Sequence, residues 1–126
     1  MAGLGIDIVD ISRFDKHRGN LDSRFCKKVF TDGERDYLSR KGKASMAGLF
    51  AAKEAVAKAL GTGFKGFWPK DIEIRHNPRG APYAVLHGKA SEIAENAEIM
   101  LSISHTKTSA AAAAAIVQNN SPRADI

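Results

Sequence analysis

A carboxylate stands inside an otherwise apolar segment near the start of the chain. Asp7 lies between Ile6 and Ile8, in a run whose side chains alternate as in a strand. An ionised carboxylate is costly to bury without a partner, so Asp7 needs a cation, a metal ion or contact with water. The structural alternative is an aspartate at a strand end that caps the following turn. The residues alone leave both interpretations open.

Three charged residues break the pattern of a good amphipathic helix. Apolar side chains between residues 45 and 60 gather on one stripe, yet Lys53 projects from near its middle and Glu54 from its edge. Lys58 follows Glu54 by one turn, so an ordinary surface ion pair, worth about 0.3–0.5 kcal/mol, is the structural alternative. That alternative explains Lys58 well and Lys53 poorly.

A histidine ends a further apolar segment among hydroxyl side chains, in the sequence SISHT at residues 102–106. A lone histidine such as His105 is more often structural than catalytic. The sequence contains no GxSxG nucleophile elbow, Walker loop or HExxH zinc motif. Any chemistry of His105 therefore depends on residues that the fold brings beside it.

Two carboxylates from distant segments, with lysines and a histidine, suit one chemistry well. Mg²⁺ is held by few protein oxygen ligands and completes its octahedron with water and substrate phosphates. Lysines neutralise phosphate as point charges. If the fold joins Asp7 to Glu54, the residues point to Mg²⁺-dependent phosphoryl transfer.

The two carboxylates are predicted on different elements. Residues 4–9 alternate at strand period, which places the even-numbered apolar residues on one face and Asp7 on the opposite face. Residues 45–60 show helical spacing, with Ser45 as the expected N-cap and Gly61 as the stop.

The other elements follow from caps, turns and alternation. Helices are expected after Ser12, over residues 21–30, from the capping box of Thr31 and Glu34 to about residue 41, and over residues 89–97. Strands are expected at residues 72–75 and 83–86, joined as a hairpin by the turn sequence NPRG, and at residues 99–104 and 109–117. The six alanines at 110–115 have helical propensity, but small residues let two backbones or subunits approach closely, which favours a strand.

Composition describes an ordinary soluble globular domain. The chain has 126 residues, of which 44% are hydrophobic and 26% charged. The single Cys26 excludes an internal disulfide. The start of the chain lacks the features of a signal peptide, and the longest apolar run is too short to span a bilayer. A cytoplasmic protein without a membrane partner is expected, with one domain over residues 1–118 and a polar tail over residues 119–126.

Positive charge is concentrated near the N-terminus. The formal net charge is +5, and residues 12–28 hold six basic against two acidic side chains. Such a patch attracts an anionic partner, whether nucleic acid, a membrane surface, a phosphorylated ligand or an acidic protein. The plain alternative is a solvated helix face.

Four segments stand out in order along the chain: GIDIVDISRF at residues 5–14, FAAKEAVAKALGTG at 50–63, the stretch from Trp68 through DIEI to Gly80 and Pro82, and SISHT at 102–106. Together they resemble the holo-[acyl-carrier-protein] synthases, the small class of 4′-phosphopantetheinyl transferases. The resemblance covers nearly the whole chain. It implies an α+β fold, in which a mostly antiparallel sheet packs against one long central helix and shorter helices.

The resemblance also implies a reaction and its residues. The family transfers the phosphopantetheine arm of coenzyme A to a serine of an apo carrier protein, in fatty acid or polyketide biosynthesis, and releases adenosine 3′,5′-bisphosphate. By position, Asp7 and Glu54 would hold Mg²⁺, Lys58 would stabilise phosphate charge, and Glu54 would accept the serine proton, with Asp7 or a metal-bound water as alternatives. Contacts to coenzyme A are implied for Lys53, Lys58, Gly61, Gly80, Ala81, Pro82, His105 and Thr106, with His105 also counted as catalytic.

The family's partners follow in the same way. An acidic carrier protein would dock on the charges Arg13, Lys16, Arg24, Lys27 and Lys28. The family is trimeric with sites between subunits, which would also explain the alanine-rich strand. One position departs from the pattern: Leu49 stands where members often carry an arginine, so that a basic contact to the nucleotide would need a substitute such as Lys53, Lys65 or Arg40.

Two other functions are compatible with parts of the sequence. A basic nucleic-acid-binding module accounts for the charge, but leaves Asp7, Glu54 and His105 unexplained and lacks an aromatic–basic surface of the kind that reads RNA. A catalytically silent carrier-binding subunit conflicts with the intact Asp7, Glu54 and Lys58. The transferase is the preferred interpretation.

Overall fold

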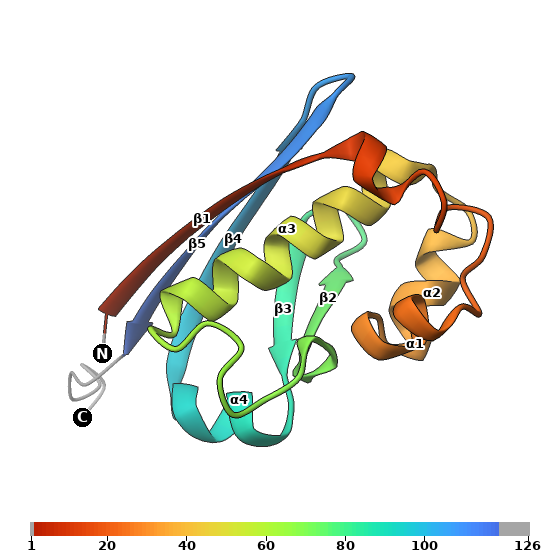
Figure 1. Ribbon diagram of the computed structural model, residues 1–126. Helices are drawn as coiled ribbons and strands as arrows, with labels where there is room; N and C mark the ends of the chain where they lie inside the picture. Colours follow the sequence, from red (N-terminus) through yellow and green to blue (C-terminus); the bar gives the residue numbers. More distant parts are fainter. Residues whose placement is uncertain (1, 119–126) are drawn as a thin grey trace.

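The computed structural model describes residues 2–118 and arranges them around one long helix, α3 (Figure 1). Along the chain the elements are β1 (Ala2–Asp10), the 3₁₀ turn η1 (Ile11–Phe14), α1 (Arg24–Val29), α2 (Asp32–Leu38), α3 (Lys43–Ala59), the 3₁₀ turn η2 (Pro69–Asp71), β2 (Ile72–His76), β3 (Pro82–Leu86), α4 (Gly88–Ala94), β4 (Ala97–His105) and β5 (Ser109–Gln118). The predicted α+β fold, with antiparallel strands packed against a long central helix, is confirmed.

The strands form two antiparallel sheets. The larger has the order β1-β5-β4, and in its register Asp7 lies opposite Ala112, which lies opposite Ile103. The smaller is the predicted β2–β3 hairpin. The side chain of Asn77 accepts hydrogen bonds from two backbone N–H groups of its turn, and Gly80 adopts a φ of 87° that favours glycine.

Helix α3 lies unusually close to the larger sheet. A Cβ atom at Gly5 would stand 1.9 Å from the backbone oxygen of Ala55, so only glycine permits this approach. Facing alanines on α3 and β5, among them Ala55, Ala112 and Ala114, are buried in the contact. The alanine run is therefore a strand, as predicted, and its small side chains allow the close packing.

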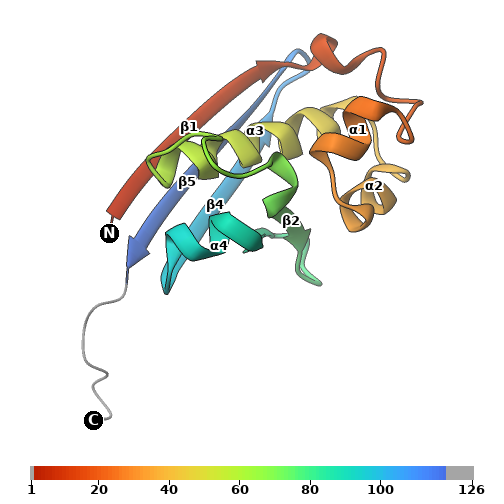
Figure 2. The ribbon, with the colours of Figure 1, turned by 60° about the horizontal axis from the view of Figure 1, so that its bottom comes forward.

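On the side of this sheet that points away from α3, no other element of residues 2–118 covers the strands (Figures 1 and 2). Asp7 does lie opposite the apolar residues of β1, but its own face is the one that packs on α3. Leu4, Ile6 and Ile8 are exposed, at 84%, 70% and 69%. Met100 of β4 and Val117 of β5 extend the exposed apolar surface.

The helix boundaries differ from the predictions in detail. The first helical segment is only the η1 turn, and it follows Asp10 instead of being capped by Ser12. Helix α1 is shorter than residues 21–30 because the Ser23 side chain accepts from Cys26 N and so fixes a later start. The capping box of Thr31 is present, although α2 ends at Leu38.

Helix α3 begins earlier than residue 45. Its N-cap is Gly42, which has no side chain to accept a hydrogen bond, so the prediction of Ser45 as N-cap is wrong. Helix α4 ends at Ala94, and Ala97 already belongs to β4.

The predicted tail, residues 119–126, lies outside the described residues, so the domain boundary at residue 118 stays a prediction. Within residues 2–118, no helix is both long enough and apolar enough to cross a membrane.

Candidate active site

The first candidate carboxylate, Asp7, meets a lysine from α3. Because Gly5 lets α3 lie directly on β1, Lys58 reaches the strand and its Nζ donates to Asp7 Oδ1 and to the carbonyl of Ile6, both at 3.0 Å. The Lys58 side chain is half exposed, whereas the Asp7 side chain is mostly covered. The partner of Lys58 is thus Asp7, and the predicted alternative of a Glu54–Lys58 ion pair is not the arrangement found.

Only one of the two carboxylate oxygens of Asp7 is paired. Its Oδ2 is buried and has no hydrogen-bond partner in this structure. A buried acceptor left without a partner costs about 1–3 kcal/mol, more when it carries charge. An uncompensated carboxylate oxygen of this kind is what a hard cation binds.

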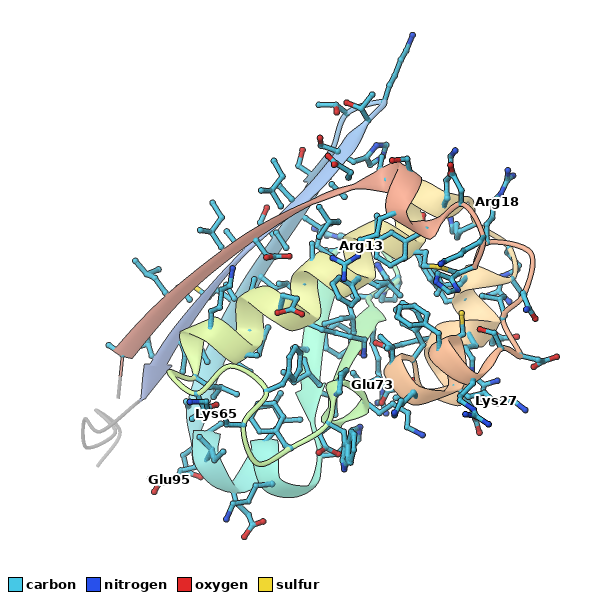
Figure 3. The ribbon with its side chains drawn as sticks, viewed as in Figure 1. Arg13, Arg18, Lys27, Lys65, Glu73 and Glu95 are labelled. Atoms are coloured by element: carbon cyan, nitrogen blue, oxygen red, sulfur yellow. The ribbon has the colours of Figure 1, made fainter. Side chains whose placement is uncertain are left out.

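The second carboxylate lies within electrostatic range of the first. Burial raises the pKa of Glu54, the negative charge of Asp7 raises it further, and Lys58 and Arg13 act in the opposite direction. Arg13, labelled in Figure 3, stacks its guanidinium over the ring of Phe50 on α3, with Cζ 4.9 Å from the ring centroid. Two carboxylates and two cations therefore converge where β1, η1 and α3 meet.

The donor set fits magnesium better than zinc. Within residues 2–118 no group of three or more His, Cys, Asp or Glu side chains is placed to hold a metal ion. A structural zinc site needs four protein ligands. Mg²⁺ keeps several waters and is commonly held by one or two carboxylates together with substrate phosphates. Asp7 and Glu54, with the unpartnered Oδ2, match that requirement.

A second group of predicted residues lines a small cavity on β4. His105, Gly80 and Pro82 line a pocket of about 230 Å³ together with Leu49 and the neighbouring rings of Tyr37 and His76. Those two rings stack in parallel with centroids 4.2 Å apart. A pocket with a flat aromatic wall and histidines suits a planar, anionic ligand end.

Three further residues predicted to contact coenzyme A lie in or beside turns. Thr106 stands beside His105, and its Oγ1 accepts from the backbone N–H groups of Thr108 and Ser109 in the β4–β5 turn. Gly61 ends α3 with a φ of 84°, and its N–H donates to the carbonyl of Lys58. Ala81 is exposed on the hairpin turn beside the pocket.

The two groups lie on opposite flanks of α3. Asp7 is on one edge strand and Ile103, a lining residue of the pocket, is on the other, with β5 between them. Two strand spacings amount to about 10 Å, and α3 packs over that gap: the methyl of Ile103 meets Gly48 on one side while Lys58 meets Asp7 on the other. One chain therefore holds the two groups of predicted site residues apart from each other.

Known proteins share both the sequence and the fold. The family model described as the 4′-phosphopantetheinyl transferase superfamily matches residues 3–116. The chain belongs to this superfamily. A holo-[acyl-carrier-protein] synthase of Thermoanaerobacter sp. (strain X514) is 46% identical over 110 residues, which cover 83% of this chain and 79% of the relative. The resemblance inferred from the four segments is thereby confirmed.

Solved synthases have the same architecture. That of Bacillus anthracis str. Ames, in complex with CoA (3′,5′-ADP), has a TM-score of 0.77 and 36% identity, and covers 93% of this chain and 96% of its own. That of Helicobacter pylori, in complex with coenzyme A, has a TM-score of 0.78 and 33% identity, and covers 90% of this chain and 99% of its own. The α+β fold of this phosphopantetheinyl transferase is therefore that of the family.

One predicted coenzyme A contact is wrong for this phosphopantetheinyl transferase. Lys53 is buried, and its Nζ donates to Glu34 Oε1 at 2.7 Å, to the carbonyl of Ile72 at 2.6 Å and to that of Pro69 at 3.1 Å. The three acceptors use all three N–H groups of the ammonium. Lys53 therefore joins α3 to α2 and β2 inside the protein and has no donor left for a ligand.

The sequence interpretation missed the network around that lysine. Glu34 was expected only as a capping-box residue, yet its Oε2 also accepts from Ile74 N at 2.7 Å. Glu73, also buried, accepts from Thr31, Arg75 and His87. Burial raises the pKa of Glu73, but these hydrogen bonds outweigh it and hold that pKa below its ordinary value. A glutamate in an apolar strand was the only signal for Glu73.

Leu49 forms part of the pocket wall in this phosphopantetheinyl transferase and is buried. Neither Arg40 nor Lys65, the exposed residues expected to substitute for an arginine here, lines that pocket. Arg40 pairs with Asp36 on α2, and Figure 3 shows Lys65 on the loop after α3. The ionisable side chains among the lining residues are Tyr37, His76 and His105.

The predicted basic patch of residues 12–28 lies at the surface, and acidic side chains do not neutralise it. Both acidic residues of the segment are paired, Asp15 with Lys43 and Asp22 with Arg35. The five predicted docking cations are all exposed, and none forms an ion pair within residues 2–118: Arg13, Lys16, Arg24, Lys27 and Lys28. Figure 3 shows Lys27 at the surface of α1, on the same side of the molecule as Arg18.

The raised pKa of Glu54 predicts a stability effect that depends on pH. A carboxyl whose pKa is higher in the folded than in the unfolded state destabilises the fold once pH exceeds both values, and this penalty vanishes as pH falls below both. Glu54→Gln is therefore expected to raise the melting temperature at neutral pH without Mg²⁺, and to lose that advantage in acid. Thermal unfolding over a pH series measures the difference. A Glu54→Gln variant that is less stable than the parent at neutral pH would contradict the expected cost of burying this carboxylate beside Asp7.

Proposed function

We propose that this protein transfers 4′-phosphopantetheine from coenzyme A to a serine of apo acyl carrier protein, with Mg²⁺ held by Asp7 and Glu54. The observation that carries the proposal is the buried, unpartnered Oδ2 of Asp7 beside Glu54 and Lys58. The family and the coenzyme A complexes of its relatives supply the substrate. Fatty acid or polyketide biosynthesis is the pathway class such a reaction serves.

The chain's own groups account for the steps. The serine oxygen bonds to the phosphorus of phosphopantetheine, the bond from that phosphorus to the departing 3′,5′-ADP oxygen breaks, and the serine proton passes to a carboxylate. Glu54 is the proposed acceptor because its carboxylate lies within electrostatic range of Asp7 and Lys58, where the reacting phosphate would be held; Asp7 is the alternative. The half-exposed Lys58 side chain presents its ammonium to the charge of the departing phosphate. When bound, Mg²⁺ neutralises the pyrophosphate and polarises it toward attack.

The nucleotide end is assigned to the pocket on β4. Gly80, Ala81 and Pro82 would lie against the adenine, and His105 and Thr106 by the phosphates, supported by the convergence of Gly80, Pro82 and His105 on one cavity. Since α3 separates this pocket from Asp7 in one chain, a complete site draws one half from a neighbouring subunit. The bare apolar face of the β1-β5-β4 sheet is the surface available for a homotrimer.

The remaining partner is the carrier itself. The five unpaired cations near α1 would attract an acidic carrier protein and govern the association rate and its salt dependence. A cytoplasmic location remains a prediction.

The reaction and the metal are tested together by intact mass. The protein, apo acyl carrier protein, coenzyme A and Mg²⁺ are expected to give a carrier heavier by one phosphopantetheine, and EDTA is expected to abolish the gain. No gain with several carriers would overturn the transferase. Binding to nucleic acid that needs no Mg²⁺ and weakens steeply with salt would favour the basic module instead.

A further inference from the structure

A further groove is lined by aromatic residues, none of which lines the pocket of His105. Phe64, Gly66, Phe67, Trp68 and Pro69 line a hollow of about 410 Å³ in the segment between α3 and β2. Phe67 is buried and packs edge-on against Phe64, with ring centroids 5.7 Å apart, so the two rings form a firm apolar surface. Trp68 is 63% exposed beside it.

The groove borders the basic surface. The Nζ of Lys28 on α1 lies 6.0 Å from the centre of the Trp68 ring, within cation–π range, and η2 packs against α1. Helix α1 has the sequence RFCKKV, with three basic and no acidic residues. An exposed tryptophan thus stands directly beside unpaired positive charge.

That combination indicates what the groove binds. Tryptophan is enriched among the residues that dominate protein–protein binding, where such an aromatic anchor is surrounded by polar contacts. The matching surface must bring an apolar side chain for the indole and carboxylates for Lys28. A copy of this same surface would bring further lysines of α1 against Lys28, and so repulsion. The pantetheine arm has no carboxylate.

We propose that the Phe64–Trp68 groove anchors an apolar side chain of the acidic carrier protein, while the adjacent lysines of α1 bind its carboxylates. This inference rests on the proposed function, because the carrier is its protein substrate. Trp68 acts as the apolar anchor of docking, and it is not among the residues that line the pocket of His105.

Trp68 is the only tryptophan of the chain, so its fluorescence reports on the groove directly. We would titrate the full-length protein with a tryptophan-free apo carrier whose acceptor serine is replaced by alanine, and in parallel with coenzyme A and Mg²⁺. The carrier is expected to shift the emission to shorter wavelength as the indole becomes covered, and coenzyme A alone is expected to leave it unchanged. An emission shift with coenzyme A alone would assign the groove to the pantetheine arm and overturn the proposal. Carrier binding that calorimetry detects but that leaves the Trp68 emission unchanged would overturn it as well.

Kinetics of variants provide the second test. Trp68→Ala is expected to raise the KM for the carrier about tenfold or more, the effect of losing one anchor residue, while kcat and the KM for coenzyme A stay within about twofold. Trp68→Phe should keep most of the affinity, and Lys89→Gln, a lysine of α4, is the charge control. An unchanged carrier KM in Trp68→Ala overturns the inference while leaving the transferase intact. Absence of transfer by the parent protein overturns the proposed function itself.

Discussion

Replacing Asp7 by asparagine is expected to lower the rate of phosphopantetheine transfer by about 10²- to 10³-fold without unfolding the protein. An amide oxygen is uncharged and a poor ligand for a hard cation, and the variant also removes the ion pair that orients Lys58. The fold should persist because the lysine of that ion pair is half exposed and can turn to water, and because Oδ2 of Asp7 contributes no hydrogen bond. Initial rates of holo-carrier formation, measured by intact mass over a series of Mg²⁺ concentrations, test the expectation.

Asp10→Asn is the matched control for this variant. Asp10 ends the same strand, is exposed, and makes no side-chain hydrogen bond to the following turn, so its replacement should leave the rate within about twofold. Asp7→Asn should need more Mg²⁺ for half-maximal rate and should not reach the parent rate at saturation. Transfer by Asp7→Asn within about threefold of the parent at every Mg²⁺ concentration would remove Asp7 from the metal site.

The meeting of Asp7 with α3 was foreseeable only in part. Alternation in β1 correctly placed Asp7 on the face opposite the apolar row. Periodicity in α3 identified Glu54 as a charged residue at the edge of the packed face of the helix. Neither pattern states the distance between the two elements. That distance is set by Gly5, whose missing side chain lets the helix lie directly on the strand. Such a close approach cannot be predicted from β1 alone, because it depends on where the backbone of α3 lies.

The apolar row itself shows a second limit. Alternation distinguishes two faces of a strand, but it does not say which face another element covers. In β1 the glycines and Asp7 face α3, and the larger apolar side chains face outward. The outward-facing apolar row is the surface offered to the proposed homotrimer, and the hydrophobicity of a strand does not distinguish such a row from one that faces the core.

Lys53 was misjudged for a related reason. A helix pattern shows that a lysine points to the packed side, and ligand contact is one explanation of that placement. The explanation found here, a carboxylate from α2, lies 19 residues earlier in the chain and had already been accounted for as a capping residue. One side chain can fill both roles, since Oε1 of Glu34 accepts from Lys53 and from Thr31 N.

Lys53→Met is expected to destabilise the fold by about 3–5 kcal/mol, the largest stability effect we predict. It leaves the fully buried carboxylate of Glu34 without its cation and leaves the carbonyls of Ile72 and Pro69 without this donor. Burial lowers the pKa of Lys53, an effect that Glu34 opposes, so the pair depends on both members. Urea unfolding followed by circular dichroism measures the change. Lys58→Met, one turn and a half along the same helix and half exposed, should cost less than about 1 kcal/mol.

The double variant Lys53→Met/Glu34→Gln separates a lost ion pair from lost packing. If the penalty comes from an uncompensated buried charge, neutralising Glu34 as well should restore part of the stability, and the double variant should be more stable than Lys53→Met alone. Glutamine keeps one carbonyl oxygen, which can accept from Thr31 N or from Ile74 N but not in both positions, because its NH2 group is a donor; the recovery is therefore expected to be partial. If the two penalties simply add, Glu34 is not the group that holds Lys53 in place. Recovery would show that one buried ion pair couples α2 and β2 to the helix that carries Glu54.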